Sequence, residues 1–447
     1  MQKKVWKIIA IVGGIFLVWV LTFFVFGKST RRVVHPTLEF WSVFDTSDEM
    51  APMLADFART TGIKVNYRSF TDLAEYRETL LFELAAGEGP DVAAIHAEWL
   101  PKYYDLLAPL PDELDYSQKD LGKDFLDGVV ESVVVNEQIF GLPMYLDTLA
   151  IFYNKTFFRN VLSKPYAAPE VKWSGIRDDV IGLTVADAED PTGFFRSGIA
   201  LGRADNITRG VDIFYNIYLQ FGGADLPESS RERAKDDNGK NYNPLSAALE
   251  FLTTFSRNSA NREYSWSAEM GADAEKEIGE FARGRVAMIA GYSYYFDEIK
   301  NAIKTNRTKN PIDFDEVAIA SFPQIYDTKK IAADFFTLSV AKFSEYPLES
   351  WRLILELTGR DSQSQYFDAT NKTTSRRDLV EEQKDDLTFG VFAEQSVFAD
   401  VLPMADDEAF DAEVAATLDS ISDGELTAAE AARALSQFFA DTAEAAE

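Results

Sequence analysis

The sequence predicts an α/β protein in which a parallel sheet alternates with helices, arranged as two domains or one bilobed unit. The chain has 447 residues, which exceeds what a single hydrophobic core normally organises. Hydrophobic residues make up 46% and aromatic residues 13%, as in a packed globular protein. Between residues 37 and 96, strand-like and helix-like segments alternate.

Residues 37–44, TLEFWSVF, have the aromatic and β-branched content of a strand. A helix should follow directly, because Thr46 and Glu49 have the spacing of a capping box. Gly62 is placed to end this helix. The apolar residues between these two points recur at helical spacing: Met50, Met53, Leu54 and Phe57.

A second strand is expected from Lys64, KVNYRS, then an amphipathic helix over 73–86 and a third strand from Asp91, DVAAIH. This β-α-β-α-β order predicts parallel strands with right-handed crossovers. Ligands bind such sheets outside the carboxyl ends of the strands. The loops at those ends begin at 42–45 and 96–99.

The middle of the chain, about 160–290, is predicted to be mostly helical. Asn243 and Pro244 fit the N-cap and first position of a helix. Residues 236–240, DDNGK, contain a hairpin-type Asn-Gly turn. Residues 314–323 are strand-like, and the end of the chain is helical and strongly acidic.

The N-terminus carries the pattern of a membrane segment. Residues 8–26 hold no charge and are long enough to nearly span a bilayer core. We expect 1–7 to be a basic cytoplasmic stretch, 8–26 a transmembrane helix and 27–36 a linker. A cleaved signal peptide is the alternative, but the apolar run is longer than is usual and no A-x-A-like site follows it.

Composition excludes several functions. The formal net charge of −29 repels phosphate backbones, so no nucleic acid is expected as a partner. There are no cysteines and only two histidines, His35 and His96, so a zinc site is not expected. A carboxylate site for calcium or magnesium stays open as an alternative, but neither a metal nor another cofactor is predicted. Residues 419–430 partly match a calcium loop, but Ile421 occupies a ligand position, and a capping box at Thr427 and Glu430 is favoured.

Aromatic and carboxylate residues cluster where binding loops are expected. Trp41 ends the first strand, and Trp99 follows the third. Within 141–158, GLPMYLDTLAIFYNKTFF, an otherwise apolar run carries Tyr145 and Asp147. Flat rings beside hydrogen-bonding groups suit sugars, which have apolar faces and polar rims. Ordinary core packing is the alternative for any one of these rings.

Several segments, in this order, resemble the family 1 extracellular solute-binding proteins, the sugar-type receptors of ABC importers. The resemblance covers roughly residues 37–440. It is carried by LEFWSVF, FARTTGIKVNY, GEGPDVAAIHAEWLPKYYDLLAPLP, IFGLPMYLDTLAIFYNKTFF, EFARGRVAMIAGYSYY and DATNKTTSRRDL. Relatives often carry a lipidated cysteine, whereas this chain has none.

The resemblance implies a two-lobed periplasmic-binding-protein-like α/β fold with a hinge and an interlobe ligand cleft, spanning 37–440 before an acidic tail at 441–447. Lobe 1 is expected at about 37–145 and 290–340, and lobe 2 at about 146–289 and 341–440. The ligand-binding residues carried over by motif are Trp41, Ser42, Asp45, Glu98, Trp99, Tyr145, Asp147, Trp266, Gly291, Tyr292 and Ser293.

The function expected from this resemblance is capture of a carbohydrate, without chemistry, for an ABC transporter permease. The protein is expected to be a monomer, tethered in the cell membrane with its C-terminal domain on the extracytoplasmic face. An anchored sensor without transport and a glycan-active enzyme with paired carboxylates are the alternatives. If Asp147 faces the cleft, Asp147→Asn should weaken binding and leave the fold intact.

Overall fold

The computed structural model describes residues 35–446 except 165, 188, 191–192, 224–233, 236–238, 258–260, 306–310 and 402–407. The predicted segments 1–7 and 8–26, and most of the linker 27–36, lie outside the described residues. Among the helices that are described, none combines the length and the apolar character needed to cross a membrane.

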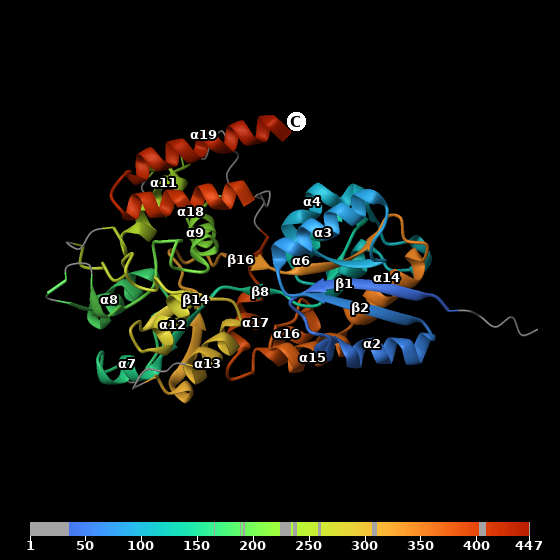
Figure 1. The fold of residues 1–447 in the computed structure, drawn as a ribbon, viewed down its shortest axis with the longest axis horizontal. Helices are drawn as coiled ribbons and strands as arrows, with labels where there is room; N and C mark the ends of the chain where they lie inside the picture. Colours follow the sequence, from blue (N-terminus) through green and yellow to red (C-terminus); the bar gives the residue numbers. More distant parts are fainter. Residues whose placement is uncertain are drawn as a thin grey trace, which may run out of the picture.

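Figure 1 shows two lobes side by side, with β8 and β16 between them. The first lobe contains a sheet in the order β2-β1-β3-β17-β4, and β7 also pairs with β17. β1 is parallel to both β2 and β3, whereas β17 runs antiparallel to β3. The strands of this sheet are β1 (Thr37–Val43), β2 (Lys64–Phe70), β3 (Val92–His96), β4 (Leu107–Ala108), β7 (Leu142–Pro143) and β17 (Phe336–Ala341).

The predicted β-α-β-α-β unit is confirmed. Helix α2 (Ser47–Thr61) begins with the expected capping box, in which Thr46 and Glu49 bond reciprocally, and ends at Gly62 in the left-handed conformation. Helix α3 (Leu73–Ala86) is capped by Asp72. Both helices bury their apolar stripes against the sheet, and their buried residues are Met50, Met53, Phe57, Tyr76, Leu80 and Leu84.

Helices cover both faces of the first-lobe sheet, with α3, α4 and α6 on one side and α2 and α15 on the other (Figure 1). A short hairpin, β5 (Val134–Val135) with β6 (Gln138–Ile139), lies beside α6. The remaining elements of this lobe are η1 (Ala97–Trp99), α4 (Leu100–Tyr103), η2 (Tyr104–Leu106), η3 (Asp112–Leu114), α5 (Gln118–Asp124), α6 (Asp127–Val133), α14 (Pro347–Leu357), α15 (Arg360–Thr370) and α16 (Arg377–Gln383).

The second lobe is built around the antiparallel sheet β14-β9-β15. Its central strand β9 (Ala150–Asn154) is fully buried and is flanked by β14 (Met288–Gly291) and β15 (Val317–Ser321). As predicted, the surrounding segment is mostly helical, and Asn243 and Pro244 begin α11. The helices are α7 (Lys155–Asn160), α8 (Trp173–Leu183), α9 (Gly210–Gln220), α11 (Pro244–Thr253), α12 (Lys276–Ala282), α13 (Tyr295–Thr305), η4 (Phe314–Glu316), α18 (Glu408–Ser422) and α19 (Ala428–Ala446); the short strand pairs are β10 (Val185–Ala186) with β11 (Phe194–Arg196) and β12 (Ala234–Lys235) with β13 (Asn241–Tyr242).

A small three-stranded sheet lies where the chain passes between the lobes, and we call it the crossing sheet. Its order is β18 (Ala399–Asp400), β16 (Ile331–Asp334) and β8 (Asp147–Thr148). Helix α17 (Gly390–Ser396) packs against β8 and β15. Its residue Gln395 donates hydrogen bonds to the Thr148 hydroxyl and the Leu149 carbonyl, which attaches the crossing sheet to the second lobe.

The lobes divide the chain differently from the expectation. Residues 290–330 belong to the second lobe, because β14 and β15 flank β9, and β16 then passes through the crossing sheet. Helices α14 and α15 belong to the first lobe, because they pack on β17 and α2. The reason is that the chain returns to the first lobe only at the passage from β16 to β17, and the helices that follow cover the sheet that β17 has joined.

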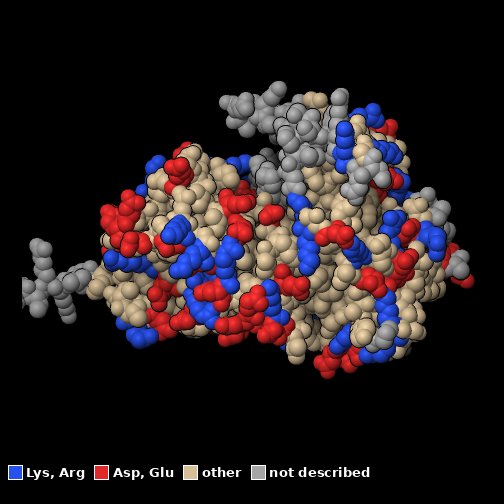
Figure 2. All heavy atoms as spheres, turned by 180° about the vertical axis from the view of Figure 1, so that it is seen from behind, with Lys and Arg blue, Asp and Glu red and all other residues tan. Residues whose placement is uncertain are grey.

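The acidic C-terminal residues do not form a separate tail, since 441–446 continue helix α19. Helices α18 and α19 pack on α11, and α18 also contacts α9. On the face seen in Figure 2, acidic and basic side chains are interspersed over both lobes. On that face, acidic side chains are therefore not gathered in one patch.

Candidate functional site

A cavity of about 350 Å³ lies between the two lobes. Its floor is formed by β16 of the crossing sheet, and its walls come from loops and helices of both lobes. The first lobe contributes the loops after β1 and β3, as expected for a parallel sheet. The lining residues are Phe44, Leu73, Ala74, Arg77, His96, Glu98, Trp99, Arg209, Val211, Asp212, Tyr215, Asn216, Tyr292, Ala332, Ala333, Asp334, Phe336, Glu408 and Asp411.

The first-lobe wall is aromatic. The rings of Trp99 and Phe336 meet edge to face with centroids 5.8 Å apart, and His96 lies 5.0 Å from Phe336. Phe44 adds a ring 6.5 Å from Phe336 and is half exposed. Its backbone φ of 71° is in the left-handed region, which is uncommon for a residue with a bulky side chain. This strain places an apolar ring at the carboxyl end of β1.

The second-lobe wall is polar and centres on Arg209. Its Nε donates to the Tyr294 hydroxyl at 2.6 Å, and its guanidinium lies 5.3 Å from the ring centroid of Tyr292. Asp212 lies 3.7 Å from Arg209 and accepts a hydrogen bond of 3.0 Å from the Tyr292 hydroxyl. Burial raises the pKa of Asp212, and Arg209 opposes that shift. These contacts restrain the side chains of Arg209, Asp212 and Tyr292, so this wall is preorganised before a ligand binds.

The floor of the cavity carries Asp334, whose Oδ1 lies 2.7 Å from His96 Nε2. Burial alone would raise the pKa of Asp334, but the hydrogen bond and charge of His96, together with Arg209, outweigh it and leave the pKa below its ordinary value. Asp334 is therefore ionised at neutral pH. The contact also joins the end of β3 to the crossing sheet.

Three of the eleven predicted ligand-binding residues line this cavity: Glu98, Trp99 and Tyr292. Ser42, Asp45 and Tyr145 lie instead around a separate cavity of about 10 Å³. There Asp45 accepts hydrogen bonds from Lys372 Nζ and the Tyr366 hydroxyl, each at 2.7 Å. These contacts give the Asp45 carboxylate a structural role within the first lobe.

Asp147 also has a structural environment, contrary to the expectation that it faces the cleft. Its side chain is 3% exposed and does not line the cavity. One carboxylate oxygen accepts from the backbone N–H and the hydroxyl of Ser293, at 3.0 and 2.6 Å, and the other accepts from the Thr148 N–H. Burial raises the pKa of Asp147 to about 6. Asp147 and Ser293 therefore connect β8 to the loop that presents Tyr292.

The remaining predicted residues are also outside the cavity lining. Trp41 packs against Phe70 with ring centroids 5.6 Å apart. Trp266 is fully buried, and its Nε1 donates to Asn206 at 2.8 Å. Gly291 is required for packing and not for backbone access to a ligand, since a Cβ there would lie 2.1 Å from the Tyr295 ring.

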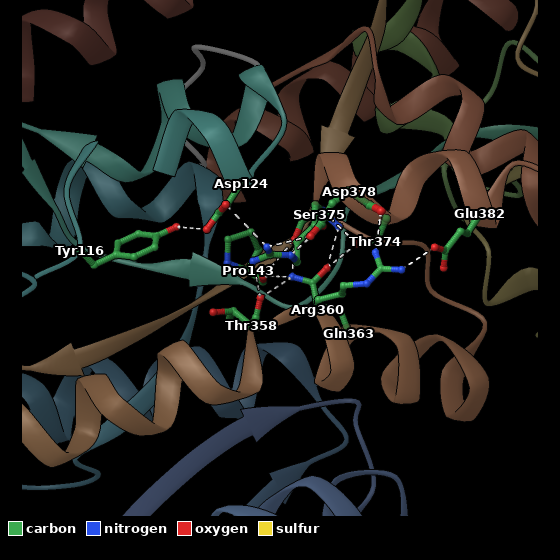
Figure 3. Close-up of polar contacts among 11 residues, drawn as sticks. Tyr116, Asp124, Pro143, Thr358, Arg360, Gln363, Thr374, Ser375, Asp378 and Glu382 are labelled. Carbon is green, nitrogen blue, oxygen red and sulfur yellow. Dashed lines mark hydrogen bonds and ion pairs between the residues drawn. The ribbon is translucent and has the colours of Figure 1, made fainter. Parts of the chain in front are cut away.

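The segment DATNKTTSRRDL, which carries part of the family resemblance, is structural as well, as Figure 3 shows. Gln363 Nε2 donates to the Pro143 carbonyl at 3.0 Å, and the Ser375 hydroxyl donates to the same carbonyl at 3.0 Å. Arg376 lies 3.7 Å from Asp124 and donates to Asp378. This network holds β7, the last first-lobe strand before the chain crosses, against α15 and α16.

Sequence reasoning missed most of the polar lining. The missed charged residues come from helix starts and from the strand floor, where no local pattern marks a binding role: Arg77, Arg209, Asp212, Asp334, Glu408 and Asp411. Phe44 had a usable signal, because it is the last residue of the first predicted strand, where binding loops are expected to begin. No group of three or more metal-ligating side chains occurs among the residues that the structure describes.

Near residue 419, the partial calcium motif has other partners. The Asp419 carboxylate accepts from the Ala204 N–H at 2.9 Å, and Asp423 pairs with Arg203 at 2.6 Å. Thr427 and Glu430 form the capping box that was favoured for this segment. Asp419 and Asp423 therefore fix the C-terminal end of α18 to the loop at 203–204 of the second lobe.

The profile of the bacterial extracellular solute-binding proteins matches residues 52–389. The chain belongs to this family. The match agrees with the resemblance found in the sequence, and a family of solute-binding proteins agrees with the expectation of binding without chemistry. No curated protein sequence matches the chain.

Solved structures share the fold of this solute-binding protein. MalE from Xanthomonas citri has a TM-score of 0.70 and 19% identity, covering 90% of this chain and 95% of that one. The GacH receptor of Streptomyces glaucescens, solved unliganded and with acarbose, has a TM-score of 0.68 and 19% identity, covering 91% and 98%. A cyclo/maltodextrin-binding protein complexed with maltotetraose has a TM-score of 0.68 and 15% identity, covering 91% and 97%. These likenesses establish the two-lobed α/β fold.

Proposed function

We propose that this protein captures a carbohydrate in the cavity between its lobes and delivers it to the permease of an ABC transporter. The lobes would close around the sugar by bending at the crossing sheet, and the closed form would dock on the permease. The protein would act as a monomer.

The observation that carries the proposal is the composition of the cavity. Trp99, Phe336 and Phe44 offer apolar ring faces from one lobe, and Tyr292 faces the cavity from the other. Carboxylates that accept strong hydrogen bonds from hydroxyls lie beside these rings, at Glu98, Asp212 and Asp334. Apolar faces with convergent polar groups match the two kinds of surface on a sugar ring.

Two of the solved structures hold carbohydrates, acarbose in the GacH receptor and maltotetraose in the cyclo/maltodextrin-binding protein, which is in keeping with this ligand class. Identities of 15% to 19% carry the fold alone, so the ligand class for this chain rests on its own cavity.

We also propose that residues 8–26 anchor the protein in the cell membrane as a single transmembrane helix. The support is the uncharged run of these residues with basic residues on both flanks. The solute-binding body would lie on the extracytoplasmic face, in keeping with a family of extracellular proteins.

A thermal-shift screen tests the ligand class. The full chain in detergent is incubated with mono- and oligosaccharides, peptides and polyamines, and the melting temperature is followed. At least one sugar should raise it, because a ligand that binds only the native state stabilises it. If peptides or polyamines stabilise the protein and no sugar does, the carbohydrate assignment is wrong.

Two tryptophan variants assign the binding to the cavity. Trp99→Leu should remove most of the sugar-dependent shift, because this ring belongs to the cavity wall. Trp266→Phe is the matched control, since Trp266 is buried elsewhere in the second lobe. It should lower the melting temperature without ligand and still respond to the sugar. An equal loss of response in both variants would contradict the assignment.

A further inference from the structure

The cavity lining carries more negative than positive charge. Its cations are Arg77 and Arg209, with His96 as a third when protonated. Its carboxylates are Glu98, Asp212, Asp334, Glu408 and Asp411. An enclosed site focuses the field of such an excess.

The two arginines already have carboxylate neighbours in the lining. Arg209 lies 3.7 Å from Asp212, and Arg77 lies 3.8 Å from Glu408, which joins the first lobe to α18. His96 lies 2.7 Å from Asp334 and 3.8 Å from Glu98, and Asp411 accepts a hydrogen bond of 2.8 Å from the Tyr215 hydroxyl. The formal charge of the lining is negative even with these pairs, since five carboxylates face two arginines and His96. Burial holds the pKa of Tyr292 well above its ordinary value, and the nearby carboxylates of Asp212 and Asp334 raise it further.

Aromatic rings stand beside these carboxylates, and rings attract cations through their negative faces. The protein's own arginines show this arrangement at both walls. Arg77 lies 5.2 Å from the ring centroid of Trp99, and Arg209 lies 5.3 Å from that of Tyr292. The same lining would receive an ammonium group of a ligand.

We propose that the carbohydrate carries a basic amine, as an amino sugar does, and that the cavity selects it over neutral and anionic sugars. The selection comes from carboxylates beside aromatic rings in a cavity of net negative charge. The inference rests on the proposed function, because it refines the class of sugar bound in the same cavity. A uronic acid or a phosphorylated sugar would place its charge against this field, and the whole-molecule charge of −29 would repel it during approach.

Matched sugars that differ mainly in charge test the proposal. One set is glucosamine, N-acetylglucosamine, glucose and glucuronate; the other is the glucosamine disaccharide, its N-acetylated form, cellobiose and cellobiouronic acid. Calorimetric titration of the full chain is run below the pKa of the amine. The amino member of at least one set should bind about tenfold more tightly than its neutral counterpart, as a charge-assisted hydrogen bond would give.

The outcomes separate the two proposals. If a neutral or anionic member binds as tightly as the amino member or more tightly, the amine selectivity is overturned and carbohydrate capture stands. If no sugar in these sets or in the wider screen binds, the proposed function is overturned, and the amine selectivity with it.

Charge-removing variants locate the effect. Asp411→Asn should weaken binding of the amino sugar about fivefold and change binding of the neutral sugar less than about twofold. Glu98→Gln should weaken binding of both sugars, because Glu98 also accepts from hydroxyls, and should weaken binding of the amino sugar about fivefold more than that of the neutral one. Asp385→Asn is the control, because Asp385 is exposed and outside the cavity lining while its loss changes the total charge equally. An equal effect of all three variants on the amino sugar would show that total charge, and not the cavity, determines the preference.

Discussion

At the scale of single residues, Asp147 shows how a site residue and a structural residue can carry the same sequence pattern. A carboxylate in an apolar run is expected either at a cleft or beneath one. Here three hydrogen-bond donors from Ser293 and Thr148 converge on it in the interior. No local pattern in the sequence could reveal the two donors of Ser293, because Ser293 lies 146 residues away.

We expect Asp147→Asn to lower stability and to leave ligand affinity within about threefold. An asparagine retains one acceptor oxygen and points an amide donor at the Ser293 or Thr148 N–H, so the free energy of unfolding should fall by about 1–3 kcal/mol at neutral pH. Urea unfolding and titration with the stabilising sugar measure the two quantities. Asp385→Asn is the exposed control. A tenfold loss of affinity with unchanged stability would return Asp147 to the ligand site.

The same carboxyl group gives a pH dependence with a defined sign. Its pKa is about 6 in the folded protein and ordinarily 3.8, so the folded state holds the proton more tightly. Its contribution to stability is therefore lost as pH rises from about 4 through 6. Between about pH 5 and 7, the free energy of unfolding of the wild type should fall by about 1 kcal/mol relative to Asp147→Asn. A difference that is constant or increases over this range would contradict the assignment.

At the scale of helices and strands, the sequence predicts element boundaries well where it carries capping residues that start or end a helix. Helix α2 begins and ends at its predicted caps, and α3 spans 73–86 as expected. The signals fail in the crossing sheet, because β8, β16 and β18 have two to four residues each and pair only across long sequence separations. The lobe boundaries were missed for this reason.

The end of β14 gives a test of packing at this scale. Gly291→Ala should lower the free energy of unfolding by about 3 kcal/mol or more, because the added methyl group would overlap the buried Tyr295 ring. Gly122→Ala is the matched control, since a Cβ there meets nothing within 4 Å in helix α5. It should be neutral or should stabilise by about 0.5–1 kcal/mol. Equal effects in chemical denaturation would rule out this role for Gly291.

At the scale of the whole molecule, the two lobes and the cavity between them follow from the family resemblance, whereas the polar lining does not. Arg209 and Asp212 lie at the start of α9 and Asp334 lies at the end of β16, so these parts of the lining meet only in the folded protein. Trp99 was found because strand ends are recognisable in sequence. No comparable sequence pattern identifies the start of α9 as part of a binding site.

The net charge of −29 predicts a response to salt. Like charges repel more strongly in the compact state than in the unfolded chain, and salt screens this repulsion within about 10 Å at 0.1 M. Raising sodium chloride from about 20 to 300 mM should therefore raise the melting temperature. A neutral osmolyte at matched osmolality is the control. A falling melting temperature would mean that favourable ion pairs outweigh the self-repulsion.

The position of β17 sets the order in which the first lobe can be completed. This strand lies between β3 and β4, yet its partner His96 precedes Phe336 by about 240 residues. A ribosome adding about 5–20 residues per second takes roughly 10–50 s to cover that distance. Until then β3 has an unpaired edge, and such an edge invites pairing with another chain. While the second lobe is being synthesised, the edge of β3 in the nascent protein therefore needs temporary cover from another part of the chain or from a chaperone.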